Sequence, residues 1–232
     1  MTRFLVGLVG ADVGGSLSPA LHEQEADELG IRLLYRTVEA GDLPLADLLH
    51  AARAFGFAGI NVTHPCKQTV LPLLDDLAPE AAELGAVNTV VFRDGAAIGH
   101  NTDGAGFADS LRLDLPDVPL GRVLLLGAGG AGAAVGHALL GAGVDRLTVA
   151  DVDGVRAARL AARLAARFGA GRAVAGPLPA APPDVDGIVN ASPIGMSHAP
   201  GTPVPVSEVL TPDMWVADVI YRPWRTELLA YA

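Results

Sequence analysis

The sequence predicts an α/β fold with two largely parallel sheets, one in each half of the chain. Short apolar runs alternate with segments in which apolar residues recur at helical spacing, and this alternation is typical of α/β units. In the second half, a cluster of glycines directly follows an apolar run and opens a helical segment. We therefore expect an N-terminal α/β domain with a mostly parallel sheet, followed by a doubly wound domain of Rossmann type.

The elements of the first half follow from residue spacing. Strands are expected at 3–9, 32–38, 57–62, 86–92 and 96–99, and helices at 18–30, 42–55 and 103–113. Ser18 is expected to cap the first helix, with Pro19 at its first position. Arg93-Asp94-Gly95 is a hairpin signal between the last two strands.

The second half repeats the alternation. Strands are expected at 122–126, 146–150, 187–190 and 216–219, and helices at 130–140, 153–168 and from Pro223 onward. The turn-rich segment 115–121 is the candidate connector between the halves. The two domains are expected at 1–104 and 105–232.

Composition excludes several classes of protein. The chain has 232 residues, 50% of them hydrophobic and 18% charged, as in a folded globular protein rather than a disordered one. A net charge of −10 argues against a nucleic-acid binder. Cys66 is the lone cysteine, so a disulfide framework and a multi-cysteine metal site are excluded, and no metal is expected. With no targeting segment evident, we expect a cytoplasmic protein. We further expect a monomer or a homodimer.

An apolar stretch at 123–144 resembles a membrane span, since His137 is its lone polar residue. However, the stretch holds seven glycines, at 127, 129, 130, 132, 136, 141 and 143. A strand, a glycine turn and a helix explain both the apolarity and the glycines, so no membrane association is expected.

The glycines at this turn form a dinucleotide-binding motif. Gly127-Ala128-Gly129-Gly130-Ala131-Gly132 satisfies G-x-G-x-x-G between a strand and a helix, where backbone N–H groups can receive a pyrophosphate. Asp151 ends the next strand, 19 positions after Gly132, where an acid can bind ribose hydroxyls. That acid repels a 2′-phosphate, so NAD is favoured and NADP remains possible, because Arg156 and Arg159 follow. The alternative is a glycine-rich turn without a ligand.

Lysine usage points to one residue. The chain has 15 Arg and one Lys, Lys67, and a surface charge tolerates Arg, whereas a group that must lose a proton does not. Lys67 closes the segment Asn61-Val-Thr63-His-Pro-Cys-Lys67 at an expected strand end, where α/β sheets bind ligands. A solvated surface charge is the alternative. No chemistry is assigned to His64 or Cys66.

Hydroxyl, amide and carboxylate groups also gather at element ends of the first half. They are Ser16, Ser18, Asn88, Thr89, Asn101, Thr102 and Asp103. Each by itself is ordinary loop chemistry, but together they indicate one site for a polyhydroxylated substrate.

These residues resemble the shikimate dehydrogenase family, including its quinate/shikimate branch, along essentially the whole chain. The matching segments are Ser16-Leu-Ser18, 61–67, Gly85-Ala-Val-Asn88-Thr, Asn101-Thr-Asp103-Gly, the glycine loop, Asn190-Ala-Ser-Pro-Ile-Gly-Met196 and Asp218-Val-Ile-Tyr221. The resemblance implies an enzyme of the shikimate pathway that oxidises shikimate or quinate reversibly with NAD(P).

The resemblance also implies residue roles. Lys67 and Asp103 would be the catalytic residues, with Lys67 as the general acid/base. The substrate would be held by Ser16, Ser18, Thr63, Asn88, Asp103 and Tyr221. The dinucleotide would be held by Gly127, Ala128, Gly129, Gly130, Ala131, Asp151, Arg156 and Val219.

Two departures from the family pattern shape the expectations. NADP-using members carry Asn-Arg-Thr/Ser after the second Rossmann strand, whereas this chain has Asp151-Val152-Asp153, as in the NAD-dependent quinate/shikimate branch. The C-terminal helices of the family are absent from the 232 residues, so the alternative is a catalytically impaired fragment that binds dinucleotide or shikimate without turnover. A dehydrogenase of the methylenetetrahydrofolate type, also with a catalytic lysine, is a third reading.

Overall fold

The computed structural model describes residues 3–41 and 43–232, and the chain divides into two compact units, Met1–Thr102 and Asp103–Ala232. The division falls at the start of helix α5 (Asp103–Asp114), so the turn-rich segment 115–121 lies inside the second unit. The division of the contacts falls before α5, which packs against α6 (Gly130–Gly141) in the same unit. The expected domains 1–104 and 105–232 stay a prediction.

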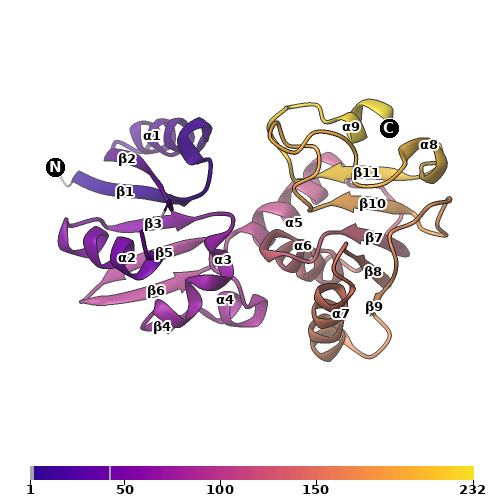
Figure 1. Cartoon of the computed structure of the whole chain (residues 1–232), viewed down its shortest axis with the longest axis horizontal. Helices are drawn as coiled ribbons and strands as arrows, with labels where there is room; N and C mark the ends of the chain where they lie inside the picture. Colours follow the sequence, from indigo (N-terminus) through magenta and orange to yellow (C-terminus); the bar gives the residue numbers. More distant parts are fainter. Residues whose placement is uncertain (1–2, 42) are drawn as a thin grey trace. The chain divides into compact units, whose positions relative to one another are not determined.

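Unit 1 is built on a six-stranded mixed sheet in the order β2-β1-β3-β5-β6-β4 (Figure 1). Its strands are β1 (Arg3–Gly10), β2 (Arg32–Glu39), β3 (Gly59–Val62), β4 (Asp76–Leu77), β5 (Thr89–Arg93) and β6 (Ala96–His100). β1 pairs in parallel with β2 and β3, whereas β5 runs antiparallel to both β3 and β6. Asp94 and Gly95 have φ of 51° and 79°, as a tight hairpin turn requires, so the predicted hairpin is present.

The helices of unit 1 lie between these strands. They are α1 (Ser18–Glu28), α2 (Leu45–Ala54), α3 (Cys66–Thr69) and α4 (Pro79–Leu84), with short 3₁₀ turns η1 (Val13–Gly15) and η2 (Leu71–Leu73). Ser18 is the first residue of α1 and not its cap; instead the Ser16 hydroxyl accepts the Ser18 backbone N–H at 3.2 Å. Helix α2 begins at Leu45 after Pro44, and the expected start at Asp42 lies outside the described residues.

Unit 2 is a doubly wound α/β domain. Its sheet has the order β11-β10-β7-β8-β9 and every pairing is parallel (Figure 1). The strands are β7 (Arg122–Leu126), β8 (Arg146–Ala150), β9 (Ala173–Ala175), β10 (Gly187–Asn190) and β11 (Trp215–Asp218). The chain passes from β7 to β8 on one side and returns to β10 on the other, which makes β7 and β10 the topological switch point. The predicted fold class is confirmed.

The remaining helices of unit 2 are α6, α7 (Gly154–Phe168), α8 (Val206–Val209) and α9 (Glu227–Tyr231). The last helix begins at Glu227 rather than near Pro223, because the Thr226 hydroxyl caps it by accepting the Leu229 N–H. Asp153 caps α7 in the same way, through Val155 and Arg156.

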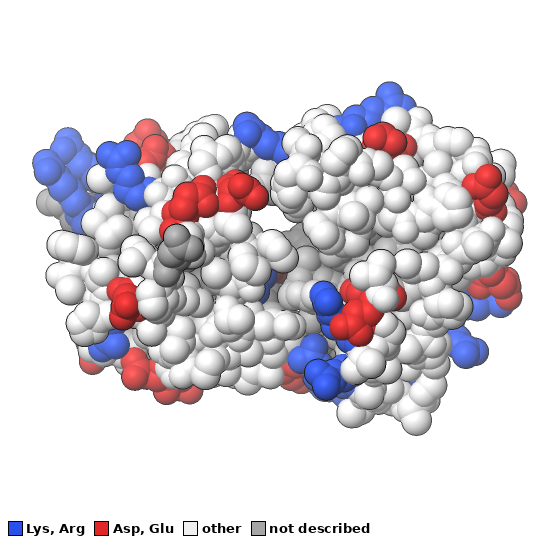
Figure 2. Space-filling view, viewed as in Figure 1, with Lys and Arg blue, Asp and Glu red and all other residues white. Residues whose placement is uncertain are grey.

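The apolar stretch at 123–144 forms the centre of the unit 2 core. Leu125 and Leu139 from this stretch are fully buried, together with Leu147 of β8. Among the described residues, no helix has both the length and the apolar character that a membrane crossing needs. On the face drawn in Figure 2, Lys and Arg side chains occur in separate groups interspersed with acidic ones, and no continuous basic surface is seen.

Candidate active site

The polar residues of unit 1 meet at one edge of its sheet. β1 and β3 end at this edge, β5 begins there and β6 ends there, as the register Val9↔Val62, Asn61↔Thr89 and Thr89↔His100 requires. The segments that follow or precede these strand ends carry Ser16, Ser18, Thr63, Lys67 and Asn88. We call this set of five residues the polar edge.

Backbone hydrogen bonds join the segments that carry the polar edge. Thr63 N–H donates to Val9 O at 2.9 Å, which holds the end of β3 against β1. Val87 N–H donates to the carbonyl of Lys67 at 2.8 Å, so the helix that carries Lys67 lies beside the segment that carries Asn88. The Lys67 side chain is half-buried. The structure therefore brings together the segments that carry Thr63, Lys67 and Asn88.

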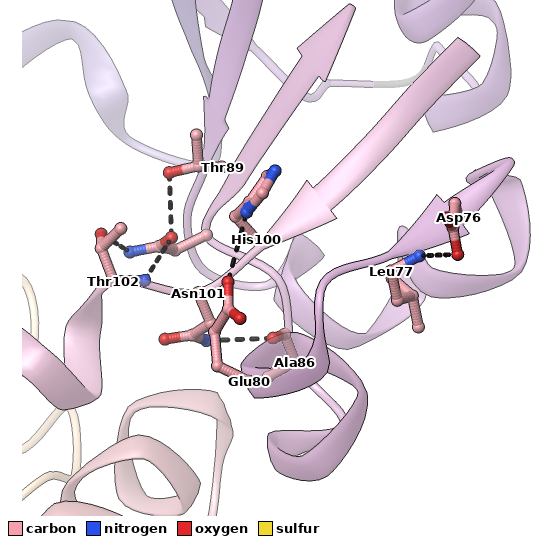
Figure 3. Close-up of polar contacts among 9 residues, drawn as sticks. Asp76, Leu77, Glu80, Ala86, Thr89, His100, Asn101 and Thr102 are labelled. Carbon is pink, nitrogen blue, oxygen red and sulfur yellow. Dashed lines mark hydrogen bonds and ion pairs between the residues drawn. The ribbon is translucent and has the colours of Figure 1, made fainter.

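The side-chain amide of Asn88 is held in one orientation by its neighbours. Its Oδ1 accepts the Thr89 hydroxyl at 2.9 Å and the Thr102 backbone N–H at 3.1 Å, while its Nδ2 donates to Thr102 Oγ1 at 2.9 Å. Figure 3 shows these contacts around Thr89 and Thr102, beside the buried Asn101 amide, which donates to Ala86 O. Thr89, Asn101 and Thr102 thus support the site rather than all facing a ligand.

A further amide, Asn61, supports Asn88 from within the sheet. Tyr35 Oη donates to Asn61 Oδ1 at 2.7 Å, and Asn61 Nδ2 donates to Thr89 Oγ1 at 3.0 Å. Tyr35 is buried, at 3% exposure. Sequence reasoning assigned no role to Tyr35 or Asn61. The signal that could have found them is an amide on a strand that is otherwise apolar, since such a group needs a partner when buried.

Ser16 and Ser18 lie after β1, beyond the turn η1. Ser16 Oγ donates to Ser18 Oγ at 3.1 Å, and both residues are half-buried. The pair thus presents two adjacent hydroxyls, as expected for a polyhydroxylated ligand. Asp103 and Tyr221, the other expected substrate residues, belong to unit 2: Asp103 is the first residue of α5, and Tyr221 follows β11 with 48% exposure.

The glycine loop of unit 2 has the close approaches that its motif predicts. Gly127 has φ of 101°, and a Cβ there would lie 2.8 Å from the backbone of Ala191 and Ser192. A Cβ at Gly132 would overlap the Gly127 carbonyl, so α6 packs directly on the turn. A larger residue fits at neither position.

The start of α6 fits the pyrophosphate of a dinucleotide. Gly129, its N-cap, makes no side-chain capping hydrogen bond, and a Cβ built on it would meet nothing within 4 Å. Backbone N–H groups in the first turn of a helix, here those of Gly130 and Ala131, have no acceptor within the helix, and the space beside Gly129 is open to a phosphate. This observation supports Gly127 to Ala131 as the residues that would hold the dinucleotide.

Asp151 lies at the carboxyl end of β8, as predicted, but its carboxylate also has a structural task. Oδ2 accepts the Ala128 N–H at 2.7 Å and Oδ1 accepts the Asp153 N–H at 2.9 Å. The next residue, Val152, is 89% exposed. Arg156 lies 3.7 Å from the Asp153 carboxylate, and the Arg156 and Val155 N–H groups together with that positive charge hold the pKa of Asp153 below its usual value.

Asn190 and Asp218 end the two neighbouring strands β10 and β11, and Val219 N–H donates to Asn190 O at 3.0 Å. Asn190 is fully buried. Burial raises the pKa of the Asp218 carboxyl, although hydrogen bonds from Ile220, Thr226 and Asn190 oppose that rise. Asn190 and Asp218 occur in the segments that resemble the family, but neither residue was given a role from the sequence.

Other reactive groups are few. Cys66 is a free, buried thiol, and burial raises its pKa. Within 3–41 and 43–232, no group of three or more His, Cys, Asp or Glu residues could hold a metal ion.

Unit 2 has the glycine loop, the acid at the next strand end and the parallel sheet of a Rossmann domain, and unit 1 presents a row of hydroxyl, amine and amide groups. These features define the class of two-domain NAD(P)-dependent dehydrogenases. A profile of the shikimate dehydrogenase substrate binding domain matches residues 8–90.

Known proteins identify the family. The chain is 54% identical to the shikimate dehydrogenase (NADP(+)) of Streptomyces avermitilis, over 99% of this chain and 81% of that protein. It is 46% identical to the quinate/shikimate dehydrogenase (NAD(+)) of Corynebacterium efficiens, over 97% of this chain and 82% of that protein. A solved structure, quinate dehydrogenase from Corynebacterium glutamicum in complex with NAD, superposes with a TM-score of 0.88 at 43% identity, covering 99% and 84% of the two chains.

The chain therefore belongs to the shikimate dehydrogenase family, and it is an oxidoreductase. It spans about four fifths of the length of these relatives, 81% of the first. The resemblance seen in the sequence is confirmed. The family assignment argues against the alternative of a dehydrogenase of the methylenetetrahydrofolate type. The alternative of a binding protein without turnover is not supported either, because these relatives are named as dehydrogenases.

Proposed function

We propose that the chain catalyses the reversible NAD(P)-dependent interconversion of shikimate and 3-dehydroshikimate, or of quinate and 3-dehydroquinate, with Lys67 as general acid/base. The observation that carries this proposal is the bond between Val87 N–H and Lys67 O. It sets the backbone of the chain's lone lysine beside the segment that carries the oriented amide of Asn88 on the polar edge. An amine and an amide carried by neighbouring segments suit a hydroxyl that must be held and deprotonated.

The proposed chemistry divides between the two units. Lys67 takes the proton of the substrate hydroxyl in the oxidative direction and returns it in the reductive one. A nicotinamide dinucleotide, which the glycine loop would hold, would supply the acceptor for the hydride of the carbinol carbon. Asp103 is the second catalytic residue and orients Lys67, while Ser16, Ser18, Thr63, Asn88, Asp103 and Tyr221 hold the hydroxyls and carboxylate of the ring.

NAD is the proposed preferred cofactor. Gly127 to Ala131, Asp151, Arg156 and Val219 are the proposed contacts. By resemblance to the family, Val152, an exposed aliphatic residue, stands where NADP-using members carry the arginine that binds the 2′-phosphate. Asp151 and Asp153 add negative charge on either side of it, which disfavours a phosphate.

A substrate-by-cofactor matrix tests the proposal: shikimate and quinate, each with NAD and NADP, followed by NAD(P)H absorbance. We expect turnover with NAD and at least one of the two substrates. Absence of absorbance change in all four combinations would leave a binding protein, and exclusive use of NADP would contradict the proposed role of Asp151. We also propose that the protein is cytoplasmic and is a monomer or a homodimer. Sedimentation equilibrium at several concentrations tests the oligomeric state.

A further inference from the structure

Asn190, at the end of β10, holds the loop that follows it. The Asn190 Nδ2 donates to Ile194 O at 3.0 Å, while Oδ1 accepts the Ser192 N–H at 3.0 Å and the Ser192 hydroxyl at 2.7 Å. The side chain is fully buried. Loop 191–196 therefore closes around one amide, whose orientation is set by the contacts on both its atoms.

Asp218, paired with Asn190 in register, holds the next loop at both of its ends. Asp218 Oδ1 accepts the Ile220 N–H at 3.0 Å, near the start of loop 219–226. Oδ2 accepts the Thr226 hydroxyl at 2.8 Å, at the last residue of that loop. One carboxylate thus fixes the separation of the loop's two ends.

The two loops are also joined to each other. Asn190 Nδ2 donates to Asp218 Oδ1 at 3.2 Å. A Cβ on Gly195 would lie 3.1 Å from Ile220 Cδ1 and 3.5 Å from Thr226 Cγ2, so loop 191–196 packs on both ends of loop 219–226. A change at Asn190, Asp218 or Thr226 is therefore expected to affect both loops through these contacts.

Tyr221 lies between the two fixed points of its loop. Ile220, immediately before it, is 4% exposed, and Thr226, after it, is 1% exposed, whereas Tyr221 itself is 48% exposed. The neighbours anchor the backbone and leave the phenol presented outward. The donors to Asp218 are an amide, a hydroxyl and a backbone N–H. All of them are neutral, and they offset the cost of burying a carboxylate only in part, which favours a role in setting geometry.

We infer that Asn190, Asp218 and Thr226 form a positioning triad that places Tyr221 for substrate binding, rather than acting only as a structural tie. The inference rests on the proposed role of Tyr221 as a substrate residue. It assigns the triad to substrate affinity, since Tyr221 is expected to contact the substrate. The dinucleotide is expected to rely mainly on the glycine loop and Asp151, and Val219, its proposed contact in loop 219–226, is held by its backbone bond to Asn190 O rather than by the Thr226 hydroxyl.

Thr226 offers a matched pair of variants. Thr226→Val removes the hydroxyl at nearly constant volume, so Asp218 Oδ2 loses its donor and α9 loses its cap, whereas Thr226→Ser keeps the hydroxyl. For Thr226→Val we expect KM for the ring substrate to rise roughly tenfold, with the Kd for NAD within about twofold of wild type. Thr226→Ser should restore the wild-type KM. Thr202→Val is the control, because the half-buried Thr202 hydroxyl also donates a hydrogen bond, to Val204 O at 2.8 Å, but lies outside the triad.

Tyr221→Phe and a second triad variant, Asp218→Asn, make the outcomes separable. If Tyr221→Phe raises KM but Thr226→Val and Asp218→Asn leave it at the wild-type value, the positioning triad is overturned while the role of Tyr221 stands. If Tyr221→Phe has no effect, the proposed role of Tyr221 fails and the inference fails with it. If Thr226→Val raises KM and the Kd for NAD in equal proportion, the triad is a structural tie and the inference is overturned. The same holds if Thr226→Val and Thr202→Val raise KM by the same factor.

Discussion

The Asp151 carboxylate accepts the backbone N–H of Ala128 at 2.7 Å, so the acid that follows β8 holds the middle of the glycine loop. Asp151 also accepts the Asp153 N–H, which fixes the turn into α7. The residue that the sequence assigned to ribose binding is therefore part of the loop's own framework. Lone pairs remain on both oxygens for ribose hydroxyls, because a carboxylate has about four acceptor sites.

Asp151→Asn should weaken NAD binding more than NADP binding. The amide keeps one acceptor and replaces the other with a donor that faces either the Ala128 or the Asp153 N–H, so both the loop and the ribose contact are weakened. We expect the Kd for NAD to rise about tenfold, with a smaller rise for NADP because the repulsion of its phosphate is relieved. Fluorescence titration with each reduced cofactor measures both values. An unchanged ratio of the two would contradict the reading of Asp151 as a cofactor selector.

Lys67→Ala should lower kcat by roughly 10²–10⁴-fold, the usual contribution of general acid–base catalysis. The Kd for NAD should not change, since the glycine loop belongs to the other unit. Lys67→Arg is the matched variant: it keeps the positive charge but removes the ability to exchange a proton near neutral pH. Steady-state absorbance assays compare the three proteins. Turnover near the wild-type rate in Lys67→Arg would exclude Lys67 as the general base.

The sequence predicted the parts of the fold that follow from local patterns. Strands 122–126, 146–150 and 187–190 have the predicted bounds, because each is a short, mostly apolar run bounded by turn residues. The cap of α1 was misplaced because the choice between Ser16 and Ser18 depends on the turn η1 before the helix, which spacing does not reveal.

The supports of the site were beyond sequence reasoning for a related reason. Tyr35 meets Asn61 across 26 positions and Asn190 meets Asp218 across 28. Such partners are set by strand order, and the order of strands in a sheet is a long-range property. Motif residues such as Lys67 and Asn88 could be found because their neighbours in sequence carry the pattern.

Tyr35→Phe should weaken substrate binding without contacting the substrate. The change removes the donor to Asn61 Oδ1 and leaves that acceptor without its 2.7 Å bond, so the orientation of Asn61, Thr89 and then Asn88 is less well defined. We expect KM for the ring substrate to rise about fivefold and the free energy of unfolding to fall by about 1–2 kcal/mol. Initial rates and urea unfolding measure the two effects. Wild-type KM with lowered stability would leave Tyr35 a purely structural residue.

Asp153→Ser should improve the use of NADP. Serine keeps the helix cap, but it releases Arg156 from the carboxylate that lies 3.7 Å away and removes a negative charge beside Val152. The Kd for NADP should fall by about three- to tenfold, while that for NAD changes little. Titrations of Asp153→Ser with and without Arg156→Ala provide the check. If the double variant binds NADP as well as the single one, Arg156 does not supply the effect.

The stability of the protein should depend on the ionisation of Asp218. Burial raises the pKa of this carboxyl above its ordinary value of 3.8, so the folded state holds the proton more tightly than the unfolded state does. The group therefore stabilises the fold at pH below 3.8, and this contribution is lost as the pH rises through the folded-state pKa. Asp218→Asn cannot titrate, so its stability lacks this dependence. The free energy of unfolding of the wild type minus that of Asp218→Asn should fall as the pH rises above about 4 and then level off. Urea unfolding of both proteins over a pH series measures this difference. A difference that stays constant with pH, or that grows as the pH rises, would show that the fold does not disfavour the charged form of Asp218.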